Sequence, residues 1–194
     1  QQRGAVQDLS YGVLRFYGQL GAVLDLLLKK PLRDKSLCHL LLVSLYQLQY
    51  SRVLPHTVVD QAVSASRCLV KGSGMQGVVN AVLRNFIRQQ EKLLKQAAEK
   101  EIGRYSHPQW WVDKLRRQYP ENFAAILSAN NKRPPMTLRV NRRKIGVEAY
   151  CDLLAENGMQ AELLWPGALR LSQPVSVESL PGFAMGLVTV QYAG

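Results

Sequence analysis

The sequence predicts a mostly α-helical protein in two parts, an all-α bundle over about residues 1–100 and a small α+β domain over about residues 101–190. Apolar residues recur every three or four positions through the first hundred residues, which is typical of helices with one buried face. The pair Pro134-Pro135 then ends the helical pattern, because proline has no N–H and disfavours the α conformation in the residue before it. Residues 136–140 alternate as a strand does, so a different fold is expected from there on.

Five helices are expected in the first part. Their apolar stripes are Val6, Leu9, Val13, Leu14 and Tyr17; residues 20–28; Leu37, Leu41, Leu45 and Leu48; Val59, Ala62, Val63 and Cys68; and Val78, Val79, Val82, Leu83, Phe86 and Ile87. The third stripe is apolar on nearly all sides, so its helix is expected at the centre of the bundle. After a break at Pro55, the run Thr57-Val58-Val59-Asp60 fits a capping box, which would begin the fourth helix.

The second part is expected to open with two helices. Pro108 suits the first turn of a helix, with Ser106 or His107 as its cap. A strand at 136–140, a helix at 147–156 and strands at 161–165, 169–171 and 187–190 follow. This β-α-β-β order is typical of part of a ferredoxin-type or RNA-recognition fold.

Positive charge is concentrated in the first 144 residues. The whole chain has 25 Lys+Arg and 14 Asp+Glu, for a net charge of +11, but only one basic residue, Arg170, follows Lys144. No acid occurs between Asp60 and Glu91 or between Glu121 and Glu148. A basic block of this kind indicates a polyanionic partner on one face, and RNA is the favoured one over a plain solvated surface or an anionic membrane.

Ten basic side chains are the candidate RNA contacts. Each would bind phosphate, which adds salt-dependent affinity and little sequence preference. Trp110 is the expected exposed platform for base stacking, whereas Trp111 belongs to the core stripe. The candidates are Arg67, Lys71, Arg84, Arg88, Lys132, Arg133, Arg139, Arg142, Arg143 and Lys144.

No catalytic, cofactor-binding or metal-binding residue is predicted. Residues 72–77 match the G-x-G-x-x-G pattern, but the segment before them is helical, and that motif needs a preceding strand. Two interpretations remain open: a turn between helices, or backbone N–H groups that hold an RNA phosphate beside Arg67 and Lys71. The three cysteines are expected to be buried thiols of a reducing cytoplasm, and no segment is apolar enough to cross a bilayer.

Two blocks of sequence resemble known families. Residues 42–48 (LVSLYQL), Pro55-His56 and residues 79–84 (VNAVLR) resemble the helical RNA-binding domain of the antitermination factor NusB, in the form fused to bacterial rRNA methyltransferases. Residues 106–110 (SHPQW), 129–141 (ANNKRPPMTLRVN) and 180–191 look like the following segments of those enzymes. The chain as a whole is similar to the 16S rRNA cytosine methyltransferases of the Sun/Fmu family.

This resemblance implies that the chain is the rRNA-binding front part of such an enzyme, with 16S rRNA as partner, no membrane partner, a cytoplasmic location and a monomeric state. Members of the family use S-adenosylmethionine and two cysteines in Pro-Cys and Thr-Cys contexts. None of the three cysteines here follows Pro or Thr, and Tyr192 stands where the family has Asp, so the chain is expected to be trimmed at both ends and inactive alone. A stand-alone NusB-type factor and a protein-interaction scaffold are the alternatives.

Overall fold

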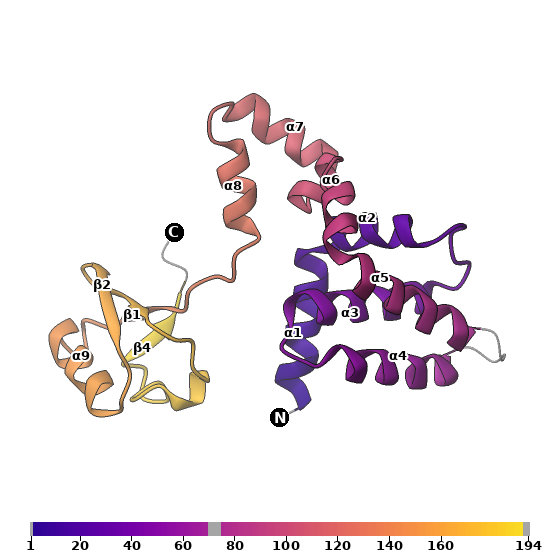
Figure 1. Cartoon of the computed structure of the whole chain (residues 1–194). Helices are drawn as coiled ribbons and strands as arrows, with labels where there is room; N and C mark the ends of the chain where they lie inside the picture. Colours follow the sequence, from indigo (N-terminus) through magenta and orange to yellow (C-terminus); the bar gives the residue numbers. More distant parts are fainter. Residues whose placement is uncertain (1, 70–74, 192–194) are drawn as a thin grey trace. The chain divides into compact units, whose positions relative to one another are not determined.

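The computed structural model describes residues 2–69 and 75–191, and the chain divides into two compact units after Lys132. The first unit holds helices α1 (Gln2–Arg15), α2 (Tyr17–Leu27), α3 (Lys35–Tyr50), α4 (Pro55–Leu69), α5 (Met75–Ala97), α6 (Glu101–Tyr105), α7 (Gln109–Gln118) and α8 (Phe123–Asn130) (Figure 1). The second unit, from Arg133 on, holds four strands and one α-helix. No helix of the described segments has the length and apolarity needed to cross a membrane.

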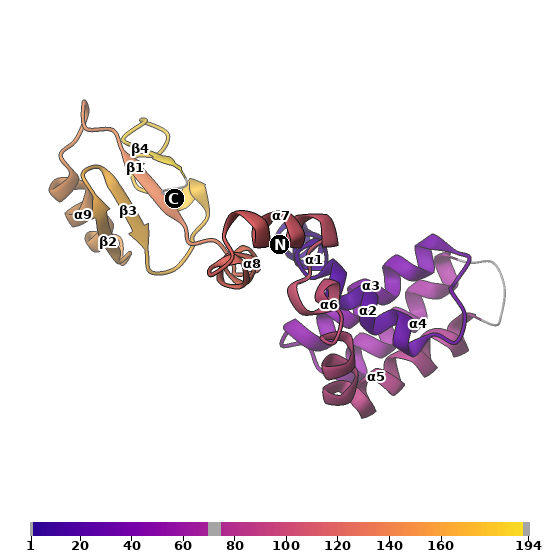
Figure 2. The same ribbon diagram turned by 90° about the horizontal axis from the view of Figure 1, so that it is seen from above.

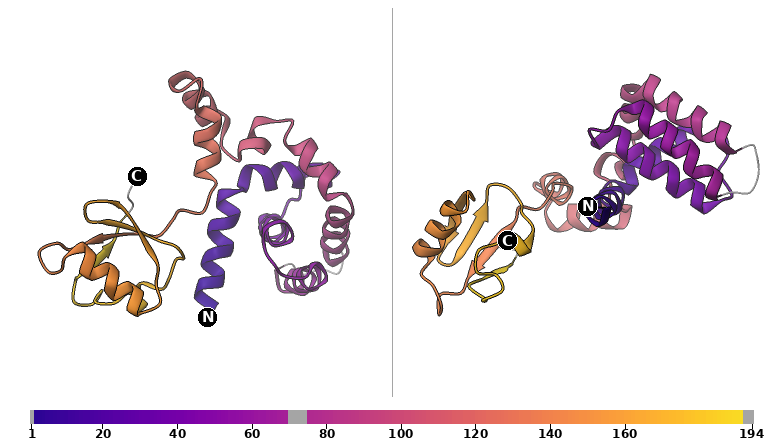
Figure 3. Two further views of the ribbon diagram at one scale, coloured as in Figure 1. Left: turned by 60° about the vertical axis from the view of Figure 1, so that its left-hand side comes forward. Right: turned by 90° about the horizontal axis from the view of Figure 1, so that it is seen from below.

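Helix α3 is the centre of the bundle, as expected. It contacts α1, α2, α4 and α5, and the right-hand view of Figure 3 shows the bundle helices side by side. Leu41 and Leu45 of α3 are fully buried, and they pack in one cluster with Leu83 and Phe86 of α5. The helix begins after Asp34, whose Oδ1 accepts hydrogen bonds from the backbone N–H groups of the first turn. Asp is one of the residues preferred at the N-cap, because its short side chain reaches these N–H groups.

Two expectations for the bundle are wrong. Helix α4 begins at Pro55 itself and not after a capping box at Thr57, because proline is tolerated at the first helical position, where no N–H is needed. The first helix ends at Arg15, and Tyr17 opens the next one. Val6, Leu14 and Tyr17 are exposed, and of the expected stripe only Leu9 and Val13 pack against the core.

Two predictions on single residues also fail. Cys68 is exposed, because it lies in the last turn of α4 beyond the packed part of that helix, whereas Cys38 and Cys151 are half-buried. Helix α7 is capped by Pro108 without a side-chain hydrogen bond, and Ser106, with a φ of 55°, ends α6 instead. The Ser106 hydroxyl accepts a hydrogen bond from the backbone N–H of Gln19 in α2, at 3.1 Å, and so joins α6 to the bundle.

Helices α6, α7 and α8 have a small core of their own. Val112, Leu115 and Leu127 are buried, and Trp111 and Tyr105 pack against them. These helices belong to the same compact unit as the bundle. The functional division into residues 1–100 and 101–190 stays a prediction.

The second unit is a four-stranded antiparallel sheet with one helix. Strands β1 (Thr137–Val140), β2 (Ala161–Trp165), β3 (Ala168–Leu171) and β4 (Val188–Val190) lie in the order β2-β3-β1-β4. Helix α9 (Val147–Glu156) lies against one face of the sheet (Figure 2). Its Tyr150 and Leu154 are buried in one cluster with residues of the strands. The central β1 lies between β3 and β4, so each crossover skips one strand, as in the ferredoxin-like fold. The predicted fold class, a helical bundle followed by a ferredoxin-like α+β domain, is confirmed.

The connection from β3 to β4 departs from the complete ferredoxin-like pattern. A ferredoxin-like fold has a second helix there, but in this chain the segment holds only the 3-10 turn Val177–Ser179. Tyr150 of α9 fixes this segment, because its buried hydroxyl donates a hydrogen bond to the backbone oxygen of Pro181, at 3.1 Å. Burial also raises the pKa of Tyr150, which keeps the hydroxyl protonated and able to donate.

Candidate nucleic-acid interface

The predicted contact residues lie on both units. In the first unit, Arg67 is exposed on α4, and Arg84 and Arg88 are exposed one turn apart on α5. Lys71 and residues 72–74 of the glycine pattern fall outside the described residues, so the phosphate-binding interpretation of that turn is still a prediction. Lys132 is an exposed residue at the end of the first unit.

Arg84 is held in place on α5 by a neighbour. Its Nε donates to Oδ1 of Asn80, one turn earlier, at 2.9 Å. The two residues line a depression of about 330 Å³ between α4 and α5, together with His56, Val59, Asp60, Val63, Gln76 and Gly77. Because Asp60 lies among the lining residues, this depression has mixed charge and is the weaker candidate for a polyanion.

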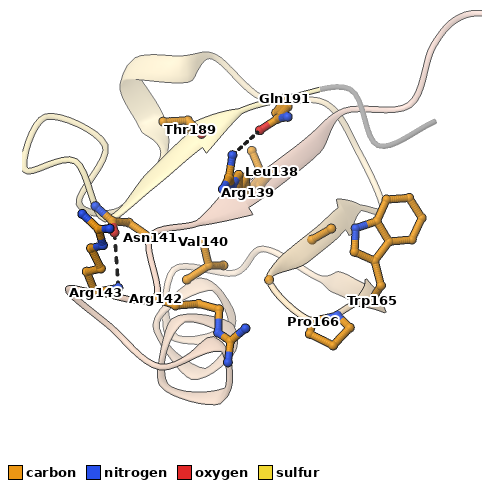
Figure 4. A pocket seen from close by; sticks show the side chains of 12 residues that line it. Leu138, Arg139, Val140, Asn141, Arg142, Arg143, Trp165, Pro166, Thr189 and Gln191 are labelled. Atoms are coloured by element: carbon orange, nitrogen blue, oxygen red, sulfur yellow. Dashed lines mark hydrogen bonds between the residues drawn. The ribbon is translucent and has the colours of Figure 1, made fainter.

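A larger depression, of about 800 Å³, lies on the sheet of the second unit. Its lining includes three arginines and no acid, and Figure 4 shows Arg139 near its middle. The lining residues are Leu138, Arg139, Val140, Asn141, Arg142, Arg143, Trp165, Pro166, Gly167, Ala168, Thr189 and Gln191. Three of the ten predicted contact residues, Arg139, Arg142 and Arg143, therefore come together here.

The register of the strands defines the middle of this depression. On β1, Arg139 faces Thr189 of β4 on one side and Ala168 of β3 on the other, and Ala168 in turn faces Trp165 of β2. These four residues form a row across the sheet. Their neighbours in β1 and β3, Leu138 and Leu169, point to the opposite face and pack under α9. The row therefore belongs to the open face, which α9 does not cover.

A β-bulge puts Trp165 in that row. Up to Leu163, strand β2 follows the pairing of β3 residue by residue, but Trp165 pairs with Ala168, so the register shifts between Leu163 and Trp165. Strict alternation would place the side chain of Trp165 with that of Leu163, on the α9 side of the sheet. The extra residue of the bulge turns the Trp165 side chain to the open face instead. Sequence reasoning missed Trp165 for this reason, since a bulge has no marker in the local sequence. The expectation that Trp110 is the exposed platform is incomplete: Trp110 is 65% exposed, but Trp165 is 51% exposed as well.

The basic residues around the sheet differ in how firmly they are held. Nη1 of Arg139 donates a long hydrogen bond, 3.5 Å, to Oε1 of Gln191. Nζ of Lys144 donates to the backbone oxygen of Met185, at 2.7 Å. By contrast, the ion pairs found in the described ranges do not involve Arg142 or Arg143, both of which are exposed.

The elements beside the glycine pattern do not fit an S-adenosylmethionine site. A glycine-rich loop binds a nucleotide-like cofactor between a strand and a helix, where the helix N-terminus meets the ligand. Here the described residues on both sides of 70–74 belong to helices, α4 and α5. Within residues 2–69 and 75–191, we also find no group of three His, Cys, Asp or Glu side chains arranged to hold a metal ion.

Comparison with known proteins identifies both parts of the chain. Residues 1–88 match the NusB family, and residues 107–178 match the ferredoxin-like domain of the RsmF/B-like methyltransferases. The chain is thus a NusB-type helical domain joined to a methyltransferase-associated ferredoxin-like domain. It belongs to the family of ribosomal RNA small subunit methyltransferase B, of which it forms the N-terminal region.

The relatives are longer than this chain. Ribosomal RNA small subunit methyltransferase B of Pectobacterium atrosepticum is 41% identical over 197 residues, which include all of this chain and 46% of that protein. The protein of that name from a strain of Escherichia coli and the probable one from Coxiella burnetii are each 39% identical over the same shares. The chain thus spans about half the length of these relatives. A crystal structure of PH0851 has the same fold, with a TM-score of 0.62 and 18% identity over 96% of this chain and 44% of that one.

Proposed function

We propose that this chain is the rRNA-binding N-terminal part of an S-adenosylmethionine-dependent methyltransferase that forms 5-methylcytosine in 16S rRNA. The chain binds and orients the rRNA, and methyl transfer requires a catalytic domain outside these 194 residues. The observation that carries the proposal is the acid-free depression with three arginines on the ferredoxin-like sheet, in a chain that matches rRNA methyltransferases along its whole length. The cytoplasm, where rRNA is made in bacteria, is the corresponding location.

Phosphate groups are the natural ligands of the exposed arginines. A guanidinium group makes two parallel hydrogen bonds to a phosphate, and it stays charged at every physiological pH. Arg84 and Arg88 present such groups on one side of α5, and Arg142 and Arg143 present them beside the sheet. Because each phosphate contact releases counterions from the RNA, the affinity falls steeply as salt is added.

Charge reversal tests this proposal. The variant in which Arg84, Arg88, Arg142 and Arg143 are replaced by Glu is expected to lose most of its affinity for a 16S rRNA fragment and to show a shallower salt dependence. The matched control is the single variant R3E/R15E/R33E/R52E. It changes the net charge by the same amount at bundle positions outside the predicted contacts. Unchanged affinity of the first variant, with the protein folded, would favour a protein-interaction scaffold and overturn the proposal.

Cofactor binding tests the second half of the proposal. The chain is expected to bind no S-adenosylmethionine in calorimetry, because its described glycine-flanking elements are helices. Tight binding of the cofactor by the chain alone would contradict this. A stand-alone NusB-type factor is the weaker alternative, since the NusB match ends at residue 88 and leaves the ferredoxin-like domain without a role.

A further inference from the structure

We propose that the open face of the ferredoxin-like sheet holds an unpaired base of the RNA, stacked on the indole of Trp165. This inference rests on the proposed function and names the kind of RNA that this site takes: single-stranded and splayed, not duplex. Aromatic side chains on an open sheet can stack bases of any sequence, and the stacking adds to the phosphate contacts of neighbouring cations.

The row across the sheet provides the space for the base. Ala168 stands between Arg139 and Trp165, and it is 7% exposed, so its methyl group forms a low floor between two long side chains. Neighbouring strands are about 4.8 Å apart, which puts the backbones that bear Arg139 and Trp165 roughly 10 Å from each other. A planar ring can therefore lie against the indole above Ala168 while Arg139 approaches its edge.

Polar groups surround this space in the pattern that a nucleotide needs. Arg139 retains free donors beyond its long bond to Gln191, and Thr189 completes the row on β4. Such side chains suit the hydrogen-bonding edge of a splayed base. Arg142 and Arg143 follow directly at the end of β1 and suit the phosphates on either side of it.

The charges on the open face favour RNA over a protein partner. The lining of the depression contains no acid, and Glu162, which strand β2 places on this face, is already paired with Arg170 of the facing strand. A protein-docking surface would need a broad apolar patch around Trp165. The other large exposed apolar residues of the strands, Leu163 and Val190, pair with Leu169 and Leu138 and so belong to the opposite face.

The test compares three single variants of the full chain. The probes are a short single-stranded oligouridylate and a blunt-ended RNA duplex in which all bases are paired. W165A is expected to bind the oligouridylate about 5- to 100-fold more weakly, the loss that removal of one stacking platform causes. W165F retains an aromatic face and is expected to bind within about threefold of the wild type. Y119A, which removes an aromatic ring as exposed as that of Trp165 at the end of α7, is the matched control and leaves the affinity unchanged.

Two further readouts separate stacking from a loss of folding or charge. Trp165 is half exposed, so W165A should unfold at the temperature of the wild type within a few degrees. The slope of log affinity against log salt should be the same in W165A as in the wild type, because no phosphate contact is removed. The affinity of W165A for the duplex should equal that of the wild type, because paired bases are stacked inside the helix and cannot reach the indole.

The possible outcomes distinguish this inference from the function on which it rests. Salt-dependent RNA binding by the wild type with equal affinity for W165A would overturn the stacking site and leave the proposed function intact. The open face would then be available for a protein partner. Absence of binding to either RNA by the folded wild-type chain would overturn both proposals.

Discussion

The aliphatic part of Arg142 lies against the backbone of Gly167, so that a β-carbon at residue 167 would stand 3.4 Å from Arg142 Cδ. Gly167 belongs to the tight turn between β2 and β3 and has a φ of 95°, a conformation that residues with a side chain rarely adopt. The carbonyl of Gly167 also accepts a hydrogen bond from the N–H of Val140, at 2.8 Å. Gly167, in the turn after Trp165, thus packs against Arg142 and is hydrogen-bonded to the end of β1.

Replacement of this glycine should affect both stability and RNA binding. G167A is expected to lower the free energy of unfolding by about 1–2 kcal/mol, the cost of a positive φ for alanine. It should also weaken RNA binding, because relief of the strained positive φ shifts the turn against which Arg142 packs. G158A is the matched control, since Gly158 has a φ of 72° but no atom within 4 Å of a β-carbon. It should lose stability in urea unfolding and retain full RNA affinity; equal affinities of the two variants would contradict a role for the Arg142–Gly167 contact.

Adjacent basic residues should differ in their contribution to RNA affinity. R143A is expected to reduce the slope of log affinity against log salt by about 1, since its exposed guanidinium is free for a phosphate. K144A should change the slope less, because Nζ of Lys144 already donates to the backbone oxygen of Met185. The slopes are measured by fluorescence anisotropy over a salt series. A larger change of slope in K144A than in R143A would contradict this ranking.

The fold could be predicted from the sequence wherever the apolar periodicity and the residues that end helices indicate the same element boundary. The boundaries of α9 and β2 and the central place of α3 follow from apolar spacing, and the proline pair marks the end of the helical half. The errors occur where the local sequence is compatible with two structures. Pro55 ends one segment but also begins α4, and the apolar residues of α1 have helical spacing without a neighbour that covers them all.

The candidate site was only partly predictable for a different reason. Arg139, Arg142 and Arg143 are found by composition, because an acid-free run of basic residues is visible without a structure. Trp165 could not be found in this way. The face of the sheet on which it lies depends on a bulge, and the bulge arises only when β2 pairs with β3, further along the chain. The open face as a whole depends on the side of the sheet on which α9 packs, which no local pattern shows.

High pH should destabilise the bundle through Tyr50. Burial, with a smaller contribution from Tyr46, raises the pKa of Tyr50 to about 12, while its hydroxyl donates to Gln19. The unfolded chain loses this proton near pH 10, so the stability that the neutral hydroxyl provides is complete below pH 10 and is lost as the pH rises to about 12. Y50F should therefore show a weaker decline of the urea midpoint over this interval than the wild type. Parallel declines would show that Tyr50 does not cause the effect.

The two thiols Cys68 and Cys151 should react at different rates with iodoacetamide. Cys68 is exposed, whereas burial of Cys151, assisted by the negative charges of Asp152 and Glu148, raises the pKa of its thiol. The thiolate is the reactive form, so Cys151 should be alkylated more slowly at a pH of about 8, as measured by mass spectrometry of the two peptides. D152N/E148Q should accelerate Cys151 only modestly, because burial is the main cause of its raised pKa. The rate at Cys68 in the same variant is the internal control, and faster alkylation of Cys151 than of Cys68 in the wild type would contradict the prediction.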